Sequence, residues 1–341
     1  MNNIDFTDIE NFESEILSDI NIEEVLGDYN NTSLMSRLER QFVNGIIRKT
    51  KPKKILEVGV AAGAGTVLIL NSIKDMPNSR LYSIDYVNNF WNKDIGYLVK
   101  EKFPILMDKW TLYSGGVSAK FMEEIGGDID LCMMDTMHMN PGEFLDFLMV
   151  YPFLKKNCIF ILHDIQTHLY VNKGCETCCA LFSTLKGKKY YLKSDTRHMG
   201  FSNIGMVILD DDMKQTIYDI LLLLTMHWQY NITEEDHNYT INLLKKYYDE
   251  NISKIYESIF INSNNINIEN TNNEHNINKQ INDVNNNISN IYNSINDVNN
   301  NISNIYNSVN NVNNNILKIV NTLAWWIPSK KKREEFRNKF I

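Results

Sequence analysis

One stretch in the first third of the chain decides its fold, and it reads Lys54-Ile55-Leu56-Glu57-Val58-Gly59-Val60-Ala61-Ala62-Gly63-Ala64-Gly65-Thr66. An apolar run broken by an acid leads into three glycines within seven residues, and a second apolar run begins after Thr66. This order predicts a buried strand, a tight glycine loop and the first turn of a helix. Glycine lets a ligand approach the backbone closely, and a helix N-terminus offers unpaired N–H groups. A nucleotide-like ligand is therefore expected at this loop.

The spacing of the glycines distinguishes between such ligands. A dinucleotide site has the pattern Gly-x-Gly-x-x-Gly, whereas this loop reads Glu57-x-Gly59-x-x-x-Gly63-x-Gly65. The pattern resembles motif I of the class I S-adenosylmethionine-dependent methyltransferases. The resemblance implies that the cofactor is S-adenosylmethionine and that these residues surround it: Glu57, Gly59, Ala61, Gly63, Gly65 and Thr66.

Length, composition and charge restrict the class of protein. The 341 residues suffice for one large domain or two, and a hydrophobic content of 43% suits a globular core. The net charge of −8 argues against a nucleic-acid partner, because such proteins usually present a basic face. Met1–Glu10 lacks a signal-peptide pattern, and the apolar run Ile220–Leu224 is too short to span a bilayer. Five cysteines without framework spacing, among them Cys175, Cys178 and Cys179, indicate free thiols in a cytoplasmic protein.

Residues 51–210 alternate between strand and helix patterns, after an N-terminal helical region predicted over residues 1–50. The predicted strands are Ile55–Gly59, Leu81–Asp85, Trp110–Tyr113, Leu131–Asp135, Ile159–His163 and Gly205–Leu209, and one of the intervening helices is predicted over Trp91–Lys102. Such alternation predicts an α/β fold, with a Rossmann-like, mostly parallel sheet and flanking helices. Ligands of these sheets bind outside the carboxyl ends of the strands. The residues that end each strand are therefore the candidates for function.

Three strand ends are assigned to the cofactor. Asp85 ends the second strand about twenty residues after the glycine loop, where an acid can accept both ribose hydroxyls. Ser114 follows the third strand, and the resemblance places it beside the adenine, although many relatives have an acid there. Ser118 or backbone groups are alternatives for that contact. Asp135, at the end of the fourth strand, is the third residue assigned to the cofactor.

The residues at the ends of the fourth and fifth strands indicate which branch of the methyltransferases the chain resembles. Asp135-x-x-His138, followed by Pro141-Gly142-Glu143, and the pair His163-Asp164 are similar to the macrocin O-methyltransferase and cephalosporin-hydroxylase-like branch, over about residues 35–210. The resemblance implies Mg²⁺ or another divalent metal on Asp135, Asp164 and His163, with His138 as the general base. Magnesium prefers oxygen ligands, so a histidine leaves a softer metal open. His163 could instead lie behind the ligands or contact the substrate.

The expected activity is methyl transfer to a sugar hydroxyl in surface-glycan or secondary-metabolite biosynthesis. A metal would acidify and orient the hydroxyl, and His138 would take its proton. Two alternatives remain open. One is a metal-dependent, hydroxylase-like enzyme of the same branch, with iron held by His138, His163 and one aspartate. The other is a non-catalytic coiled-coil assembly protein with a vestigial nucleotide fold.

The chain changes character after the helices predicted over residues 211–262. Residues 263–323 are rich in asparagine but keep apolar residues at strict 3-4 spacing, and a 14-residue unit that starts at Ile281 repeats at Ile295. This is a heptad pattern, so the segment is predicted to be a coiled coil. Ile and Val at both core positions favour a homo-oligomer of three or four chains.

The last segment, residues 324–341, combines two aromatic residues with a basic helix pattern. Trp325 and Trp326 precede Pro328-Ser329 and the basic run Lys330–Arg333. Tryptophan favours the membrane interface, and a basic amphipathic helix favours anionic lipid. Weak peripheral contact with the inner membrane is therefore one expectation, and a solvated helix that caps the coiled coil is the other.

Overall fold

The computed structural model describes residues 35–169, 174–192 and 202–340, with the backbone alone for residues 265–278. Most of the helical region predicted over residues 1–50 lies outside the described residues, and the part within them forms helix α3 (Arg37–Thr50). Ser36 and Glu39 form a capping box at its start, because each side chain accepts a hydrogen bond from the other's backbone N–H. The chain divides into two compact units, Met1–Asn267 and Ile268–Ile341.

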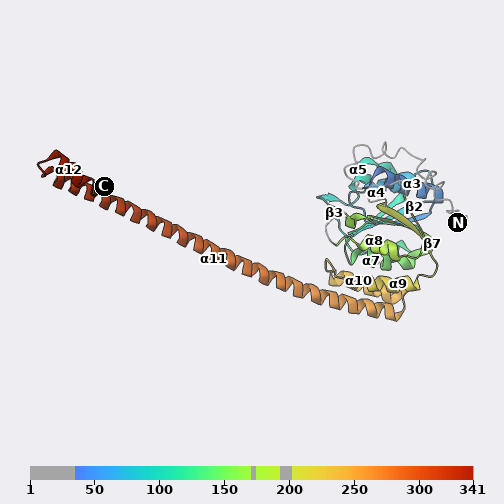
Figure 1. Ribbon diagram of the computed structural model, residues 1–341. Helices are drawn as coiled ribbons and strands as arrows, with labels where there is room; N and C mark the ends of the chain where they lie inside the picture. Colours follow the sequence, from blue (N-terminus) through green and yellow to red (C-terminus); the bar gives the residue numbers. More distant parts are fainter. Residues whose placement is uncertain (1–34, 170–173, 193–201, 341) are drawn as a thin grey trace. The chain divides into compact units, whose positions relative to one another are not determined.

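The first unit is built on a seven-stranded sheet, shown in Figure 1, with the order β5-β2-β1-β6-β7-β9-β8. Its strands are β1 (Lys54–Val58), β2 (Arg80–Asp85), β5 (Trp110–Ser114), β6 (Ile129–Met134), β7 (Leu154–His163), β8 (Gly187–Tyr191) and β9 (Ile204–Leu209). The first five strands of that order run parallel, β9 pairs antiparallel with β7, and the edge strand β8 pairs antiparallel with β9. The predicted Rossmann-like, mostly parallel sheet is therefore confirmed.

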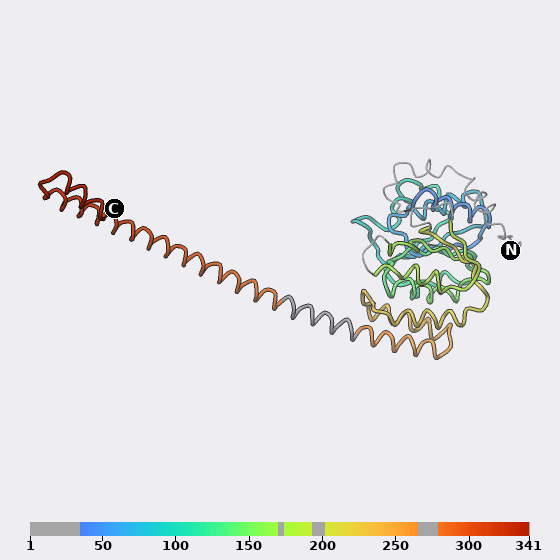
Figure 2. Tube along the Cα trace, viewed as in Figure 1, coloured from blue at the N-terminus to red at the C-terminus, as the bar shows by residue number. Residues whose placement is uncertain are grey.

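Helices cover both faces of this sheet (Figures 1 and 2). The α-helices are α4 (Ala64–Ser72), α5 (Tyr97–Lys102), α6 (Met122–Ile125), α7 (Gly142–Val150), α8 (Thr177–Thr184), α9 (Lys214–Leu223) and α10 (Glu234–Tyr247). Short 3-10 helices are η2 (Pro104–Lys109), η3 (Ser118–Lys120), η4 (Tyr151–Phe153) and η5 (Thr167–Leu169). Helices α3, α4 and α5 lie on one face, and α7 and α8 lie on the other with α9 and α10 beyond them.

Side chains of the central strands alternate between two hydrophobic cores. Ile55 and Leu131 pack with α3 and α4, whereas Leu56 and Cys132 pack with α7. The alternation follows from the two-residue repeat of a strand. In β7 the same repeat puts Ile161 on the α3 side, and it therefore directs His163 to that side as well. This placement decides which groups His163 can contact.

The structure corrects the helix predicted over Trp91–Lys102. The first half of this stretch belongs to a hairpin of β3 (Asn89–Phe90) and β4 (Lys93–Asp94), and α5 begins only at Tyr97. Trp91 and Asn92 form the turn with φ of 47° and 63°, which a helix does not allow. Strand β8 was not predicted, because its sequence Gly-Lys-Lys-Tyr-Tyr has no apolar alternation and its conformation is set by pairing with β9.

The C-terminal part of the chain is helical. Helix α11 (Glu250–Trp325) crosses the boundary predicted at residue 262, and α12 (Lys330–Arg337) follows it. Among the described residues, no helix is both long enough and apolar enough to cross a membrane.

Candidate functional site

The glycine loop lies directly against the end of β6. Gly59 and Gly63 both have φ of +94°. A Cβ on Gly59 would lie 1.8 Å from the carbonyl oxygen of Asp135, and a Cβ on Gly63 would lie 2.9 Å from the Cα of Gly96. Glycine is therefore required at both positions by conformation and by close approach. Ala61, between them, also adopts a positive φ of 50°.

Glu57 and Thr66 lie together behind the loop. Glu57 is 2% exposed, and its Oε2 accepts hydrogen bonds from the hydroxyls of Thr66 (2.8 Å) and Ser83 (2.6 Å). Burial outweighs these bonds and raises the pKa of Glu57 to about 7. A Cβ on Gly65 would lie 3.2 Å from Oε1 of Glu57. These contacts tie the start of α4 to strands β1 and β2.

Asp85, at the end of β2, holds the glycine loop in place. Its Oδ2 accepts hydrogen bonds from the backbone N–H groups of Val60 and Ala61, both at 2.9 Å, and its Oδ1 accepts one from Val87 at 3.0 Å. A carboxylate offers about four acceptor positions, so one remains for a ligand. The sequence predicted a contact with ribose but not this structural role.

Ser114 and Ser118 have different surroundings. Ser114 pairs with Asp85 across the sheet, and its hydroxyl donates to Oδ1 of Asn88 at 2.9 Å. Ser118 is buried, and its hydroxyl donates to Oδ1 of Asp146 at 2.8 Å. Burial raises the pKa of Asp146 to about 7. Of these two serines, Ser114 lies beside Asp85 at the carboxyl ends of the strands, whereas Ser118 is buried. The contact of Ser114 with adenine stays a prediction.

Three predicted site residues converge at the ends of β6 and β7. Nε2 of His138 lies 2.9 Å from Oδ2 of Asp164 and 3.7 Å from Oδ1 of Asp135. His138 and Asp164 have φ of 61° and 58°, in the left-handed region that few residues other than glycine adopt. Such conformations cost free energy and persist where surrounding contacts enforce them.

The surrounding carboxylates keep a proton on His138. Burial alone would lower the pKa of His138, but hydrogen bonds to Asp164 and Glu143 and the charge of Asp135 raise it to about 10. Burial would likewise raise the pKa of Asp164, yet its contacts with His138 and His163 lower it. At neutral pH the ring is thus a cation between carboxylates, and in this state it cannot accept a proton.

His163 is a buried link between these acids and helix α3. It is 1% exposed, and its Nδ1 lies 3.3 Å from Oδ2 of Asp135 and 3.3 Å from Oδ2 of Asp164. Its Nε2 lies 3.7 Å from Oε2 of Glu39, the acid of the α3 capping box. Burial would lower the pKa of His163, but the acids raise it well above the ordinary value. The ring thus faces acids on both sides.

Glu143 positions the loop that carries His138, and no role was predicted for its side chain. It is fully buried at the start of α7, and its Oε1 accepts hydrogen bonds from the hydroxyl of Thr136 (3.0 Å) and the backbone N–H of His138 (2.5 Å). Its Oε2 accepts a hydrogen bond from the hydroxyl of Thr177 at 2.5 Å. The available sequence signal was an acid, Glu143, in the first turn of a mostly apolar helix that contains one further acid, Asp146.

Two further neighbours come from distant parts of the chain. Sγ of Cys178, in α8, lies 3.5 Å from Nδ1 of His138. Nδ2 of Asn203, just before β9, donates to Oδ1 of Asp164 at 2.6 Å. The cysteines are free thiols, as predicted, but their sequence pattern carried no signal that Cys178 would reach the site.

Two candidate metal-binding groups of side chains occur in the described part of the chain. One is Asp135, His138 and Asp164, and the other is His138, Glu143 and Cys178, each with ligand atoms within 4.8 Å of one another. The first contains both predicted aspartate ligands, with His138 in the place predicted for His163. Two carboxylates and an imidazole fit a divalent cation, and the imidazole suits a softer ion than magnesium. Neither group is the two-histidine, one-aspartate set of the iron alternative.

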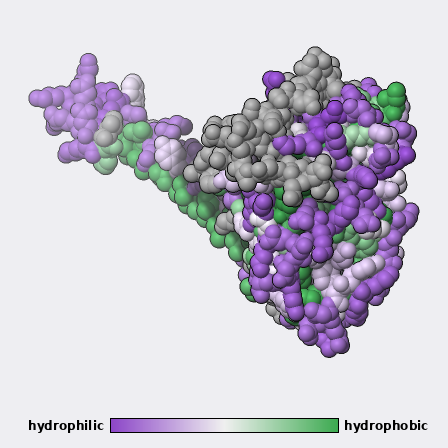
Figure 3. Space-filling model, turned by 90° about the vertical axis from the view of Figure 1, so that its right-hand side faces the viewer, coloured by the Kyte–Doolittle hydropathy of each residue, from purple (hydrophilic) through white to green (hydrophobic). Residues whose placement is uncertain are grey.

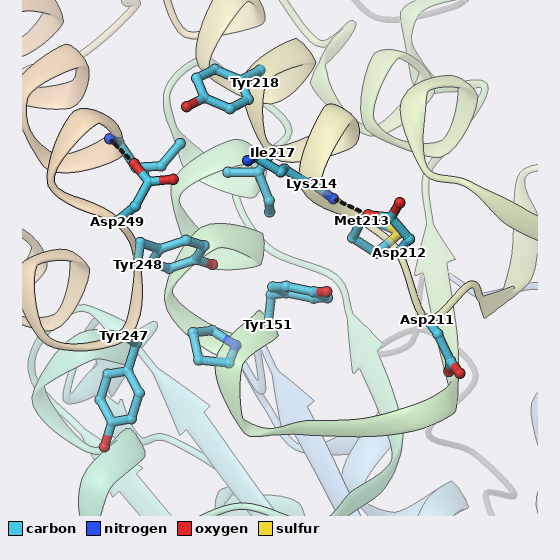
Figure 4. Close-up of a pocket in the computed structure, with 12 residues that line it drawn as sticks. Tyr151, Asp211, Asp212, Met213, Lys214, Ile217, Tyr218, Tyr247, Tyr248 and Asp249 are labelled. Carbon is cyan, nitrogen blue, oxygen red and sulfur yellow. Dashed lines mark hydrogen bonds between the residues drawn. The ribbon is translucent and has the colours of Figure 1, made fainter.

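A pocket of about 320 Å³ lies between η4, α9 and the start of α11 (Figure 4). It is at the amino ends of the parallel strands, opposite the carboxyl ends that carry the residues above. Two acids that line it accept hydrogen bonds from backbone N–H groups in the first turn of a helix. Asp212 accepts one from Lys214 in α9, and Asp249 accepts one from Ile252 in α11. Tyr151, which also lines it, lies in η4, immediately before β7, and so at the amino end of that strand. The pocket is therefore separate from the strand-end residues.

A comparison with protein families identifies the chemistry of this region. Residues 56–165 match the family model described as a methyltransferase domain. They form a methyltransferase domain. The match begins in β1 and ends one residue after Asp164, so it includes the glycine loop, Asp85 and the cluster around His138. The predicted methyltransferase activity is thus confirmed.

Several solved structures resemble the chain, whereas no curated protein sequence matches it. A putative caffeoyl-CoA O-methyltransferase from Staphylococcus aureus is 15% identical, with 60% of this chain and 100% of that chain covered and a TM-score of 0.44. TomG, an O-methyltransferase from Streptomyces achromogenes, is 10% identical, with coverage of 60% and 96% and a TM-score of 0.43. An O-methyltransferase from Bacillus cereus is 12% identical, with coverage of 59% and 91% and a TM-score of 0.41.

Proposed function

We propose that the methyltransferase domain transfers a methyl group from S-adenosylmethionine to an oxygen atom of a sugar-containing acceptor, with the help of a divalent metal. One observation carries the proposal: the backbone of Gly59 touches the carbonyl group of Asp135. The contact joins the glycine loop, where a cofactor would bind, to the acidic cluster, where an acceptor hydroxyl would be activated. Cofactor and acceptor would thus meet at one edge of the sheet.

The cofactor half of the proposal rests on the glycine loop and Asp85. The loop resembles motif I of S-adenosylmethionine-dependent enzymes, and TomG and the Bacillus cereus enzyme were solved with S-adenosylmethionine and S-adenosylhomocysteine, respectively. The remaining acceptor position of Asp85 would take one ribose hydroxyl, and Ser114 would lie near the adenine. A sulfonium methyl group needs no activation, so the protein has only to align it with the attacking oxygen.

The acceptor half rests on Asp135, His138 and Asp164. In the structure His138 holds a proton because acids face both of its ring nitrogens. A divalent cation on Asp135 and Asp164 would neutralise these two carboxylates, and it would orient and acidify the acceptor hydroxyl. His138 would then be able to accept the proton of that hydroxyl, while Glu143 holds its backbone in position.

The sugar acceptor and the pathway rest on resemblance. Asp135-x-x-His138 and His163-Asp164 are similar to the macrocin O-methyltransferase branch. A sugar hydroxyl is a poor nucleophile at neutral pH, so the pairing of a metal with a base suits it. A setting in surface-glycan or secondary-metabolite biosynthesis agrees with that chemistry.

A direct test is methyl transfer from isotopically labelled S-adenosylmethionine to a panel of nucleotide sugars and glycans. The proposal predicts transfer to at least one hydroxyl, loss of transfer with a chelator, and recovery with Mg²⁺ or Mn²⁺. Asp164→Asn should abolish metal-dependent transfer. Asp211→Asn is the matched control, because Asp211 is an exposed acid that lines the pocket at the opposite edge of the sheet.

Calorimetry separates the two halves of the proposal. Failure of the protein to bind S-adenosylmethionine at millimolar concentration would refute the cofactor assignment. Binding of the cofactor with transfer that is unaffected by the chelator would refute the metal, and transfer to nitrogen or carbon atoms alone would refute the oxygen acceptor.

A further inference from the structure

The second unit carries a long apolar stripe on the exposed surface of α11. Its thirteen residues are all 45–63% exposed, and Figure 3 shows hydrophobic residues in green along the helix. They repeat at alternating steps of three and four residues, which places them on one face of a helix. The apolar stripe consists of Ile281, Val284, Ile288, Ile291, Ile295, Val298, Ile302, Ile305, Val309, Val312, Ile316, Ile319 and Leu323.

The C-terminal helix α12 leaves this stripe uncovered. Figure 1 shows α12 turned back beside the end of α11, and the guanidinium of Arg333 lies 5.5 Å from the ring of Trp325. Val320 and Ala324 of α11 are buried, at 6% and 0% exposure. Both lie outside the apolar stripe, whereas Ile319 beside them stays 59% exposed. The contact with α12 thus uses a different face of α11.

The composition of the segment indicates that it needs a partner. Eighteen of the 45 residues from Lys279 to Leu323 are asparagine, which is a mediocre helix former. Most helical stability in proteins comes from packing of an apolar face. Along this segment the apolar stripe is the face that could supply such packing.

We propose that the apolar stripe packs against the stripes of two further copies of this chain, in a three-stranded coiled coil. The face complements itself, because the 14 residues that start at Ile281 recur unchanged from Ile295. Copies of the same chain therefore present matching apolar layers. Isoleucine and valine fill both core positions of the heptad, and this choice favours more than two strands.

The flanks of the apolar stripe also favour identical copies over a different protein. From residue 280 to residue 322, no charged side chain occupies the positions next to the core, and asparagine, serine and tyrosine predominate there. A different partner is usually selected by charge pairs at these positions. Tyr292 and Tyr306 occupy equivalent flanking positions 14 residues apart and are 65% and 67% exposed, so they add apolar area at the edge of the seam.

The size of the apolar stripe suits a stable interface. At 1.5 Å per residue, 43 residues extend about 64 Å, and a helix is about 10 Å across. Each chain therefore offers on the order of 600 Å², before the flanking tyrosines are counted. Stable complexes bury about 800 Å² per partner, and a trimer allows each helix to contact two neighbours.

Sedimentation equilibrium of the full chain at micromolar concentrations tests the proposal. The wild type should have the mass of three chains. The double variant Ile295→Asn with Ile302→Asn places asparagine in the core and should weaken association at least tenfold. The matched control is Ser289→Asn with Ser303→Asn, which introduces the same residue on the outer face of the same helix and should leave the trimer intact.

Two further measurements distinguish a loss of association from a general loss of folding. Far-ultraviolet circular dichroism should show loss of helix in the core variant alone, while the thermal transition of the first unit stays unchanged in both variants. A wild-type mass of one, two or four chains would overturn the proposal. A core variant that keeps the wild-type mass would do so as well.

Discussion

Nε2 of His138 lies 2.9 Å from Oδ2 of Asp164, and this contact joins the loop after β6 to the end of β7. Both residues have left-handed backbone conformations. Glu143 faces the other side of the ring, with its Oε1 3.4 Å from Nδ1 of His138. The histidine is thus held from two sides, and each of its ring nitrogens faces an acid on a different element. A change at either acid alters both the position and the charge of the ring.

Asp164→Asn should weaken binding of a divalent metal by at least about tenfold, the scale at which even outer residues of metal sites act. The substitution removes one of the two carboxylates, Asp135 and Asp164, that are proposed to hold the cation. Calorimetric titration with Mn²⁺ measures the effect. Asp211→Asn, the exposed control, should bind the metal as the wild type does. Equal affinities for all three proteins would show that this cluster does not bind metal.

Glu57→Gln should flatten the dependence of stability on pH. The folded protein raises the pKa of Glu57 from 4.5 to about 7, chiefly through burial. Between these values the folded state binds the proton more tightly than the unfolded state, so the free energy of unfolding falls as pH rises. The loss is complete above about pH 7 and amounts to about 3 kcal/mol. The glutamine variant lacks this titration.

Urea unfolding at pH 5 and at pH 8 measures how the free energy of unfolding depends on pH. Amide exchange in β1 reports the unfolding of the first unit. The wild type should lose about 2.5 kcal/mol more than Glu57→Gln between the two values, because part of the effect is already lost at pH 5. Glu101→Gln is the control, because Glu101 is exposed beside Lys93 and should keep the wild-type slope. A variant as pH-dependent as the wild type would show that Glu57 does not titrate in this range.

The strand ends of this fold could be predicted from the sequence, because apolar runs stop at Asp85, Asp135 and His163-Asp164. In a parallel sheet such ends meet at one edge, which is why the structure brings these residues together. The two-residue repeat of β7 also indicates on which face of the sheet His163 lies. It could not indicate that Glu39, on a helix far away in the sequence, would face that ring.

The loop contacts of the site could not be predicted in this way. Cys178 reaches His138 across 40 residues, and Asn203 reaches Asp164 across 39. Neither pair belongs to a periodic pattern, and the left-handed conformation of His138 sets the direction of its side chain. The hairpin before α5 was missed for a related reason, because its turn depends on the positive φ of Trp91 and Asn92.

Asp85→Asn should weaken binding of S-adenosylhomocysteine by about tenfold, since a hydrogen bond to a charged group contributes about 1.5–3 kcal/mol. The amide keeps one acceptor oxygen but loses the charge that binds the N–H groups of Val60 and Ala61 and would bind a ribose hydroxyl. Binding of Mn²⁺ should not change, because Asp85 lies outside the proposed metal site of Asp135 and Asp164. Calorimetry measures both affinities.

Asp94→Asn serves as the control for that variant, because Asp94 is an exposed acid whose Oδ2 lies 3.6 Å from Nζ of Lys100. It should bind both ligands as the wild type does. Equal losses of cofactor and metal affinity in Asp85→Asn would contradict a specific contact with ribose and would indicate a general collapse of the loop.

Gly59→Ala should disrupt cofactor and metal binding together, whereas Gly65→Ala on the same loop should be much milder. A Cβ on Gly59 would lie 1.8 Å from the carbonyl oxygen of Asp135 at a φ of +94°, so the loop or the end of β6 must move. Gly65 has no positive φ, and its Cβ would lie 3.2 Å from the side chain of Glu57, which can shift. Calorimetry with S-adenosylhomocysteine and Mn²⁺ should show both affinities reduced at least about tenfold in Gly59→Ala. If Gly59→Ala retained its metal affinity while losing the cofactor, the glycine loop and the acidic cluster would act independently, and the contact between Gly59 and Asp135 would not couple them.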